Sequence, residues 1–160
     1  MKDRRVLRGK LRTYQYDGAI RLIVDDGNFN DAWKITRFEI ATHDPTASGA
    51  GGYDAVGVLA THAEAVEGPT STVIGWNWDD RRQVAWTSSL MSGDTGVYPS
   101  WFGGLIDPQH VVVRDLFVAV SALSATGNNE WCYFVELERV KLNDDQAILA
   151  IIQEESQDVN

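Results

Sequence analysis

The segment His110–Leu123 constrains the fold of this 160-residue chain more than any other. Over Leu116–Ala122 the side chains are apolar on both faces of the strand that this segment predicts. Successive side chains of a strand point to opposite sides, so such a strand offers no face to water. We therefore expect it in the interior of a sheet, covered on both sides by the protein's own core or by another subunit.

The segment Trp131–Leu142 differs, because its apolar and charged residues alternate. Val135 and Leu137 fall on one face, while Glu136 and Glu138 fall on the other. This alternation is typical of a strand with one face on a core and the other in water. A polar turn with Gly and Asn joins it to the preceding strand, and the spacing predicts a hairpin.

Five shorter strands are predicted upstream, at Val6–Tyr14, Ile20–Val24, Trp33–Ala41, Asp54–His62 and Gln83–Ser88. In the third of these the apolar positions change face, which predicts a β-bulge near Thr36 or Arg37, with a short helical turn as the alternative. Stretches rich in Gly, Ser and Pro predict two long loops, at residues 44–53 and Leu90–Pro108.

A helix is expected to close the chain. Asn143 is a favourable N-cap, and Gln146 holds the third helical position that completes a capping box. Asp144 and Asp145 suit the positive end of the helix dipole. An apolar stripe follows, made of Ile148, Ile151 and Ile152.

Short strands separated by turns, with one terminal helix, predict an all-β, single-domain β-sandwich. Uneven strands and long loops favour a jelly-roll-like arrangement with a short C-terminal helix. A chain of this length forms one well-buried core rather than two. We expect a basic N-terminal arm over 1–12, a β-sandwich over 13–142, and a C-terminal helix and tail over 143–160.

The charge of the chain is divided unevenly. The first twelve residues hold six cations and one acid, whereas the rest holds eight cations and 22 acids, for a net charge of −9. A short basic arm on an acidic body suggests a segment that docks on something negative. We expect the arm to bind a partner through Lys2, Arg4, Arg5, Arg8, Lys10 and Arg12.

The partner of this arm is left open by the sequence. Val6, Leu7 and Leu11 are interleaved with the cations, which a purely solvated terminus does not need. The alternation also allows the segment to join a sheet edge with its basic side chains outward. We expect contact with a neighbouring subunit, another protein or, non-specifically, a nucleic acid. The chain carries no helix-turn-helix, zinc-finger or RNA-binding aromatic motif.

Catalytic motifs are absent from the sequence. It holds no Gly-x-Ser-x-Gly elbow and no phosphate loop. Nothing in the sequence brings the three histidines His43, His62 and His110 together as metal ligands. Cys132 is the single cysteine and is expected to be a buried, inert thiol. We expect a non-enzymatic protein without cofactor or metal, and place acid–base catalysis by His62 and Glu64 behind the other hypotheses.

The string Trp76–Arg82 is the most distinctive local feature. Its Trp and Asp residues suit the stacking and hydrogen bonding of a sugar ring, but also the anchoring of a subunit contact. A third interpretation is a loop whose indoles cap the end of the core. A second aromatic loop favours an interface, so the expected assembly residues are Trp76, Trp78, Tyr98, Trp101 and Phe102.

Three stretches carry a resemblance to a known group of proteins: Asn77–Trp86, Ile106–Val112 and Ala147–Val159. They resemble small uncharacterised virion structural proteins of marine bacteriophages. The resemblance covers about the latter half of the chain. It implies a structural subunit of a capsid, vertex, decoration or collar, built on a jelly roll.

The expected function is therefore a non-enzymatic virion structural protein that forms a homo-oligomer and docks on a larger shell of other virion proteins. Such a subunit is made in the host cytoplasm and resides in the virion. No secretory signal or membrane span is expected, since the apolar run Val111–Val120 is too short. The alternative is a carbohydrate-binding β-sandwich module that uses Trp76, Trp78 and Trp101 as a stacking platform.

Overall fold

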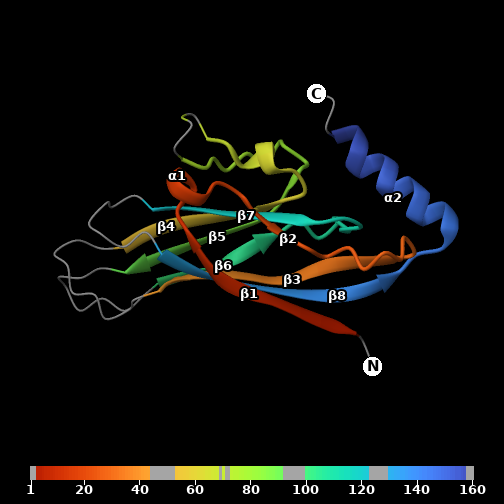
Figure 1. Cartoon of the computed structure of the whole chain (residues 1–160), viewed down its shortest axis with the longest axis horizontal. Coiled ribbons are helices and arrows are strands. Elements are labelled where there is room, and N and C mark those ends of the chain that lie inside the picture. The colour runs from red at the N-terminus through yellow and green to blue at the C-terminus, as the bar shows by residue number, and fades with distance from the viewer. Residues whose placement is uncertain are drawn as a thin grey trace.

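The computed structural model describes residues 3–43, 53–68, 70, 73–91, 100–122 and 130–157. Its elements follow one another along the chain as shown in Figure 1. They are β1 (Arg4–Arg12), α1 (Tyr14–Asp17), β2 (Ile20–Leu22), β3 (Asp31–Thr42), β4 (Tyr53–Ala60), the 3-10 helix η1 (Ala63–Val66), β5 (Gln83–Met91), β6 (Ser100–Ile106), β7 (Leu116–Ala122), β8 (Glu130–Lys141) and α2 (Asp144–Ser156).

The strands form two antiparallel sheets that face each other. One sheet has the order β1-β8-β3, and the other has the order β2-β7-β4-β5-β6. The nested pairs β1–β8, β2–β7 and β4–β5 are those of a jelly roll, in which the chain folds back on itself as two Greek keys. The predicted all-β sandwich of jelly-roll type, with one C-terminal helix, is confirmed.

Strand β6 brings the two sheets together at one side. Its backbone pairs with β5, and it also lies against β3. In a jelly roll this strand is the fourth strand of the sheet that contains β3. A Cβ atom at Gly104 would stand only 2.7 Å from the carbonyl oxygen of Phe38. The absence of a side chain at Gly104 is therefore what lets these two strands approach so closely.

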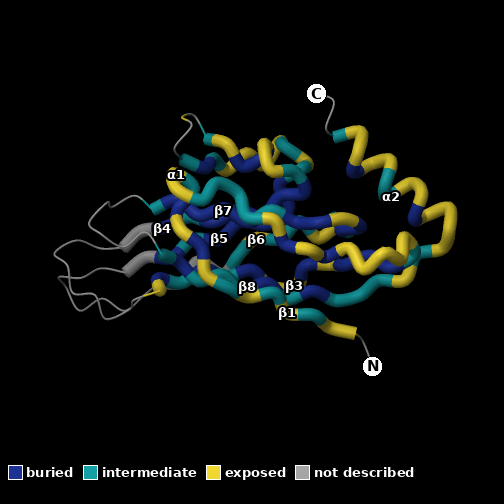
Figure 2. The backbone as a smooth tube through the Cα atoms, viewed as in Figure 1, coloured by how far each residue is buried: buried dark blue, intermediate teal, exposed yellow. Residues whose placement is uncertain are grey.

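The main core lies between the sheets, and Figure 2 shows the buried stretches running along the strands of both layers. β3 confirms the predicted bulge, because its register with β8 shifts between Ile35 and Arg37. The extra residue returns the second half of the strand to the inner face. The largest fully buried side chains of this core include Trp131, Phe38, Ile40, Leu59, Leu116 and Leu137.

Strand β7 is buried on both faces, as its sequence predicts. Leu116, Val118 and Val120 lie in the core between the sheets. Ala119 lies in a second apolar cluster on the other side of the five-stranded sheet, together with Trp86 of β5. That cluster is covered by residues 61–68 and 73–76, here called the covering segment, so the cover comes from the chain itself.

The predicted hairpin between the last two strands is wrong. β7 belongs to the five-stranded sheet and β8 to the three-stranded sheet, so the connection crosses between layers. The physical reason lies in the two patterns: a doubly apolar strand needs a sheet covered on both faces, whereas an alternating strand suits a sheet with one open face. Residues 123–129, which join them, lie outside the described part of the chain.

Two predicted boundaries also need correction. The stretch Leu90–Pro108, expected as a loop, contains β6 and the end of β5. Two consecutive glycines in this stretch are typical of a loop in the sequence. In the structure Gly104 lies in a strand, because its close contact with β3 leaves no room for a side chain. The strand expected from His110 begins only at Leu116, and the residues before it form a loop with a single bridge from Val112 to Trp33.

The basic N-terminal segment is an edge strand of the sandwich. β1 pairs with β8 along its whole length, from Arg4 opposite Glu138 to Arg12 opposite Glu130. Leu11 is buried in the main core, and Leu7 packs against it. Residues 4–12 are thus an integral part of the fold, and their removal would uncover the core instead of detaching an arm.

Helix α2 begins at the predicted capping box. The Asn143 side chain accepts a hydrogen bond from the Gln146 backbone N–H at 2.8 Å, and the Gln146 side chain accepts one from the Asn143 backbone N–H at 3.2 Å. Asn30 also donates to Asp144 at 2.7 Å, which ties the helix start to the loop before β3. In the described part of the chain, no helix has the length and apolar character to cross a membrane.

Candidate functional site

Three surfaces hold the residues with functional potential. The first is the outer face of the three-stranded sheet, called the basic sheet face below. The second is the loop of residues 76–82, called the tryptophan loop. The third is the cleft between α2 and the body of the sandwich, called the α2 cleft.

The basic sheet face is built by the alternation of β1 and β8. Trp131, Val135 and Leu137 point into the core, so Cys132, Phe134, Glu136 and Glu138, at the alternate positions, point outward. Cys132 is therefore only partly buried, and its expected burial is wrong because it falls on the outer face of β8. The register then places the outward side chains of β1 opposite those of β8. These facing pairs are Arg4 and Glu138, Val6 and Glu136, Arg8 and Phe134, Lys10 and Cys132, and Arg12 and Glu130.

Most cations of the expected arm already have partners within the chain. Exposed ion pairs of this kind contribute little to stability, because water and salt screen the charges. They nevertheless hold the cations in place along the face. The pairs are Arg4 with Glu136 at 3.3 Å, Lys10 with Glu130 at 3.5 Å, and Arg12 with Asp17 at 2.8 Å.

Arg5 points to the opposite side of β1 from these cations. Its guanidinium donates to the carbonyl oxygens of Val24 at 3.1 Å and Ile23 at 3.0 Å. It also lies 5.9 Å from the centre of the Trp33 ring. Arg5 thus closes one end of the sandwich and is not part of the basic sheet face.

Arg8 has no ion pair among the residues that the structure describes. It borders a hollow of about 520 Å³ in the basic sheet face, whose lining includes Phe134, Cys132 and Ala41. The guanidinium of Arg37 lies 5.2 Å from the centre of the Phe134 ring. The hollow therefore has an apolar floor surrounded by charge.

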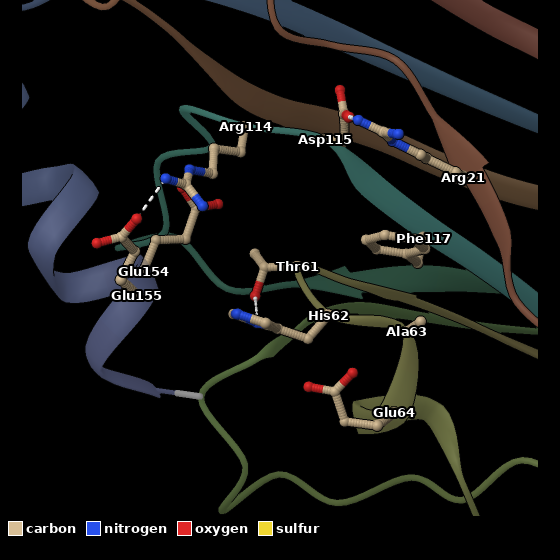
Figure 3. A pocket seen from close by; sticks show the side chains of 10 residues that line it. All are labelled: Arg21, Thr61, His62, Ala63, Glu64, Arg114, Asp115, Phe117, Glu154 and Glu155. Carbon is tan, nitrogen blue, oxygen red and sulfur yellow. Dashed lines mark hydrogen bonds and ion pairs between the residues drawn. The ribbon is translucent and has the colours of Figure 1, made fainter. Parts of the chain in front are cut away.

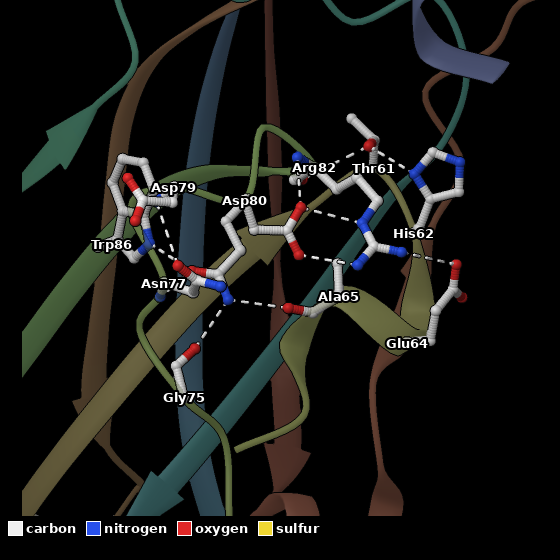
Figure 4. A network of polar contacts seen from close by, with 11 residues as sticks. Thr61, His62, Glu64, Ala65, Gly75, Asn77, Asp79, Asp80, Arg82 and Trp86 are labelled. Carbon is white, nitrogen blue, oxygen red and sulfur yellow. Dashed lines mark hydrogen bonds and ion pairs between the residues drawn. The ribbon is translucent and has the colours of Figure 1, made fainter. Parts of the chain in front are cut away.

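The tryptophan loop is held by one buried side chain, Gln83. Its Oε1 accepts hydrogen bonds from the Asn77 backbone N–H at 2.9 Å and from Trp86 Nε1 at 2.7 Å. Its Nε2 donates to the carbonyl oxygens of Ala65 and Gly75, both at 2.8 Å. Gln83 thus joins the loop, the covering segment and β5 into one network (Figure 4).

An acid–base pair stiffens the far end of the tryptophan loop. Arg82 donates to both carboxylate oxygens of Asp80, at 2.9 and 2.8 Å, and also contacts Glu64 of η1 at 3.6 Å (Figure 4). These side-chain hydrogen bonds hold the pKa of Asp80 below its usual range. Hydrogen bonds therefore fix the backbone of the loop at Asn77 and at Asp80, so that Trp78 between them is held in position.

The two indoles of the loop remain on the surface. Trp78 is 66% exposed and meets the buried Trp86 edge to face, with ring centres 6.3 Å apart. Trp76 is 37% exposed. The third interpretation of this loop, indoles that cap the end of the core, does not describe Trp78, because most of its surface is exposed.

The remaining expected assembly residues are only partly described. Lys2 and Tyr98 lie outside the described residues. Trp101 and Phe102 lie on β6, where their backbones pair with Ser89 and Ser88 of β5. They therefore belong to a strand at the edge of the five-stranded sheet and not to a loop.

The α2 cleft has a volume of about 660 Å³ and is lined mainly by charged side chains (Figure 3). Arg21 pairs with Asp115, and Arg114 pairs with Glu155 of α2. Burial raises the pKa of Asp115, but hydrogen bonds from the Val24 backbone and from Arg21 outweigh it and hold that pKa below its usual range. Cations and carboxylates of the cleft are thus largely matched with each other.

Glu154 is the buried exception in this cleft. It is 5% exposed, and neither carboxylate oxygen has a hydrogen-bond partner of normal geometry in the described chain. Burial raises the pKa of Glu154 to about 7, and the nearby Asp115 acts in the same direction. The backbone N–H groups of Val113 and Arg114 and the Arg114 charge oppose this shift.

The histidines do not assemble a catalytic or metal site. His62 Nδ1 lies 2.8 Å from the Thr61 hydroxyl, while Glu64 contacts Arg82, so the two candidate acid–base groups have other partners. Burial lowers the pKa of His110 to about 4 and keeps its ring neutral. Within the described ranges, no three His, Cys, Asp or Glu side chains gather as a metal ion would require.

The apolar stripe of α2 faces away from the body. Ala147 and Glu154 are the buried residues of the helix. Ile148 is 53% exposed, Leu149 is 58% exposed and Ile152 is 54% exposed. Ile148 and Ile152 of the predicted stripe thus point mostly into solvent, together with Leu149, whereas the third predicted member, Ile151, is partly buried.

Comparison with models of known protein families gives no match, and no curated protein matches the sequence.

Sequence reasoning missed two residues that organise these surfaces. Gln83 is a polar residue inside an otherwise apolar strand, which is a usable signal for a buried hydrogen-bonding role. Glu154 lies seven residues after Ala147, two helical turns away on the same side, but only the packing of α2 shows that this side is buried.

We expect Gln83→Ala to lower the free energy of unfolding by about 2–4 kcal/mol, because it leaves several buried donors and acceptors without partners. Urea unfolding of the variant and the wild type measures the difference. Gln15→Ala, at an exposed position, is the matched control and should change stability by less than about 0.5 kcal/mol. A Gln83→Ala protein as stable as this control would contradict the role assigned to Gln83.

We expect Glu154 to make the protein less stable as the pH rises from 5 to 8. The pKa of Glu154 is raised to about 7 in the folded state, so the folded protein holds more protons than the unfolded chain between about 4.5 and 7. Stability contributed by the neutral carboxyl is therefore complete at low pH and lost through this window, by about 2–4 kcal/mol. Urea unfolding at pH 5 and pH 8 measures this loss.

The fall in stability between pH 5 and pH 8 should be nearly absent in Glu154→Gln, because its side chain stays neutral. This variant should exceed the wild type in stability at pH 8 and resemble it at pH 5. Glu155→Gln, a neighbouring exposed carboxylate, should retain the wild-type pH dependence. Equal pH dependence in the wild type and Glu154→Gln would show that the carboxyl is not titrating in a buried site.

Proposed function

We propose that this protein is a non-enzymatic structural subunit that self-associates and docks on a larger protein shell, as a virion protein does. The observation that carries the proposal is the apolar stripe of α2, with Ile148, Leu149 and Ile152 each more than half exposed. A contiguous apolar surface on a folded protein usually marks a contact with another molecule. The jelly-roll architecture supports the proposal, because viral capsid subunits commonly use it.

Further support comes from the groups with catalytic potential. His62 and Glu64 are each engaged by another side chain of the same subunit. Apart from Glu154, the charged groups of the α2 cleft are matched in ion pairs, and the pair of Arg114 with Glu155 holds α2 against the body. These contacts favour a structural role over acid–base catalysis.

The nature of the shell partner follows from the basic sheet face. Arg4, Lys10 and Arg12 are paired with carboxylates of the same chain, which weakens the case for the packaged genome as their partner. A mosaic of both charges around an apolar hollow is instead typical of a protein–protein contact. The assignment to a virion rests on the resemblance of the sequence to phage structural proteins.

We expect the protein to self-associate in solution. Sedimentation velocity over a series of concentrations should show an average mass that rises above that of the monomer, because association buries the exposed apolar side chains of α2. The same series in higher salt should show weaker association if charged surfaces take part. A strict monomer at the highest concentration would contradict the proposal.

Carbohydrate binding is the second candidate function, and one observation favours it. Trp78 presents an exposed indole on a preorganised loop, directly beside the exposed Asp79. An aromatic face and a carboxylate at this spacing suit a sugar ring and its hydroxyl groups. Under this function the tryptophan loop, and not α2, is the principal site.

We expect no saturable sugar binding if the structural role is correct. A glycan array with the wild-type protein and with Trp78→Ala tests this directly. Trp78 is largely exposed, so the substitution should change stability by less than about 1 kcal/mol. Saturable binding by the wild type that is lost at least tenfold in Trp78→Ala would replace the structural proposal with the carbohydrate-binding one.

A further inference from the structure

We propose that α2 of one copy docks on the basic sheet face of a second copy, so that subunits join head to tail. This inference rests on the proposed self-association and names the two surfaces that make the contact. The helix supplies an apolar stripe between acidic ends, and the sheet supplies an apolar hollow among cations.

The helix surface combines apolar and acidic side chains. Ile152 is the centre of the stripe, because it follows Ile148 by four residues and Leu149 by three, the spacings that make side chains neighbours on a helix surface. Asp145 precedes this stripe by one turn and Glu155 follows it by three residues. The helix carries four acidic residues and no basic residue. Asp144 and Asp145 are exposed at its start, whereas Glu154 is buried and Glu155 pairs with Arg114 of the same subunit.

Two α2 helices are poor partners for each other. In an antiparallel pair, Asp144 and Asp145 of one copy would face Glu155 of the other, and a parallel pair would align the acids directly. Like charges opposite one another oppose association. The stripe therefore requires a partner surface with positive charge.

The basic sheet face has the complementary composition. Its hollow of about 520 Å³ exposes Phe134, Cys132 and Ala41 near the exposed Val6. Charged side chains cover the rest of this face, where six cations of β1 and β3 stand against four carboxylates of β3 and β8 and Asp17, which pairs with Arg12. The cations are Arg4, Arg8, Lys10, Arg12, Lys34 and Arg37, and the carboxylates are Glu39, Glu130, Glu136 and Glu138.

The two surfaces also agree in size. The 13 residues of α2 give a helix about 20 Å long. The nine residues of β1 span about 30 Å, so the helix can lie along the strand without overhanging it. Direct pairing of two β1 edges is less favourable, since it would set one row of cations against another.

The contact must form between copies. α2 leaves the three-stranded sheet after Lys141 and runs beside the five-stranded sheet, where Arg114 pairs with Glu155 (Figures 1 and 3). From this position the helix cannot reach the outer face of its own three-stranded sheet. Because the two surfaces are different patches, the contact is heterologous and produces a ring or an open chain of subunits.

The test is complementation between two defective variants. Ile148→Asp/Ile152→Asp damages the helix surface, and Arg8→Glu/Lys10→Glu damages the sheet surface; all four side chains are exposed. Each variant alone should associate at least tenfold more weakly than the wild type in sedimentation velocity. An equimolar mixture should form a heterodimer and nothing larger, because one intact helix then meets one intact sheet face.

Matched controls are placed away from both surfaces. Glu67→Lys reverses an exposed charge in the covering segment, and Leu105→Asp replaces an exposed apolar side chain on β6. Neither should change the association of the wild type by more than about twofold. Circular dichroism of every variant checks that the fold is retained.

The outcomes separate this inference from the function on which it rests. A wild type that stays monomeric overturns both. A wild type that associates, with variants that also associate normally or with a mixture no stronger than its components, overturns the head-to-tail contact alone. Recovery of association in the mixture, with unchanged controls, establishes it.

Discussion

The five-stranded sheet carries apolar side chains on both of its faces, and the rest of the structure depends on covering them. The three-stranded sheet covers one face and the covering segment covers the other. Gln83 links the covering segment to β5 and to the tryptophan loop, so the cover and the exposed indoles are positioned by one side chain. The outer face of the three-stranded sheet is exposed to solvent in the subunit, and its side chains are accordingly mostly charged.

The uneven charge of the chain is largely resolved within the subunit. The basic strand β1 pairs with the acid-bearing strand β8, and several of its cations contact carboxylates there. A small surplus of cations remains on this face, while all the charged residues of α2, at the other end of the chain, are acidic. A charge split that is spread along the sequence thus becomes two separate surfaces of opposite sign. Such an arrangement favours contacts between unlike surfaces of neighbouring copies.

Some of the candidate site was visible in the sequence, and some was not. The cations of β1 and the exposed Trp78 follow from residue type and local pattern. The roles of these residues do not follow from the sequence, because the partner of a cation depends on which strand lies beside it. Arg5 and Arg8 have different contacts only because the alternation of β1 places them on opposite faces. Glu154 is indistinguishable in sequence from its neighbour Glu155, yet one is buried and the other is exposed.

The sequence by itself determined the features that depend on a few adjacent residues: the capping box at Asn143, the bulge near Thr36 and the doubly buried strand β7. Backbone geometry and side-chain alternation act over such short distances, so their signals are local. Only the tertiary structure decided that β7 and β8 join different sheets, that β6 is a strand and that the stripe of α2 points outward. These outcomes depend on which apolar surfaces, far apart in the sequence, pack against each other. That choice is determined by the total apolar area that the whole fold buries, and not by any short segment.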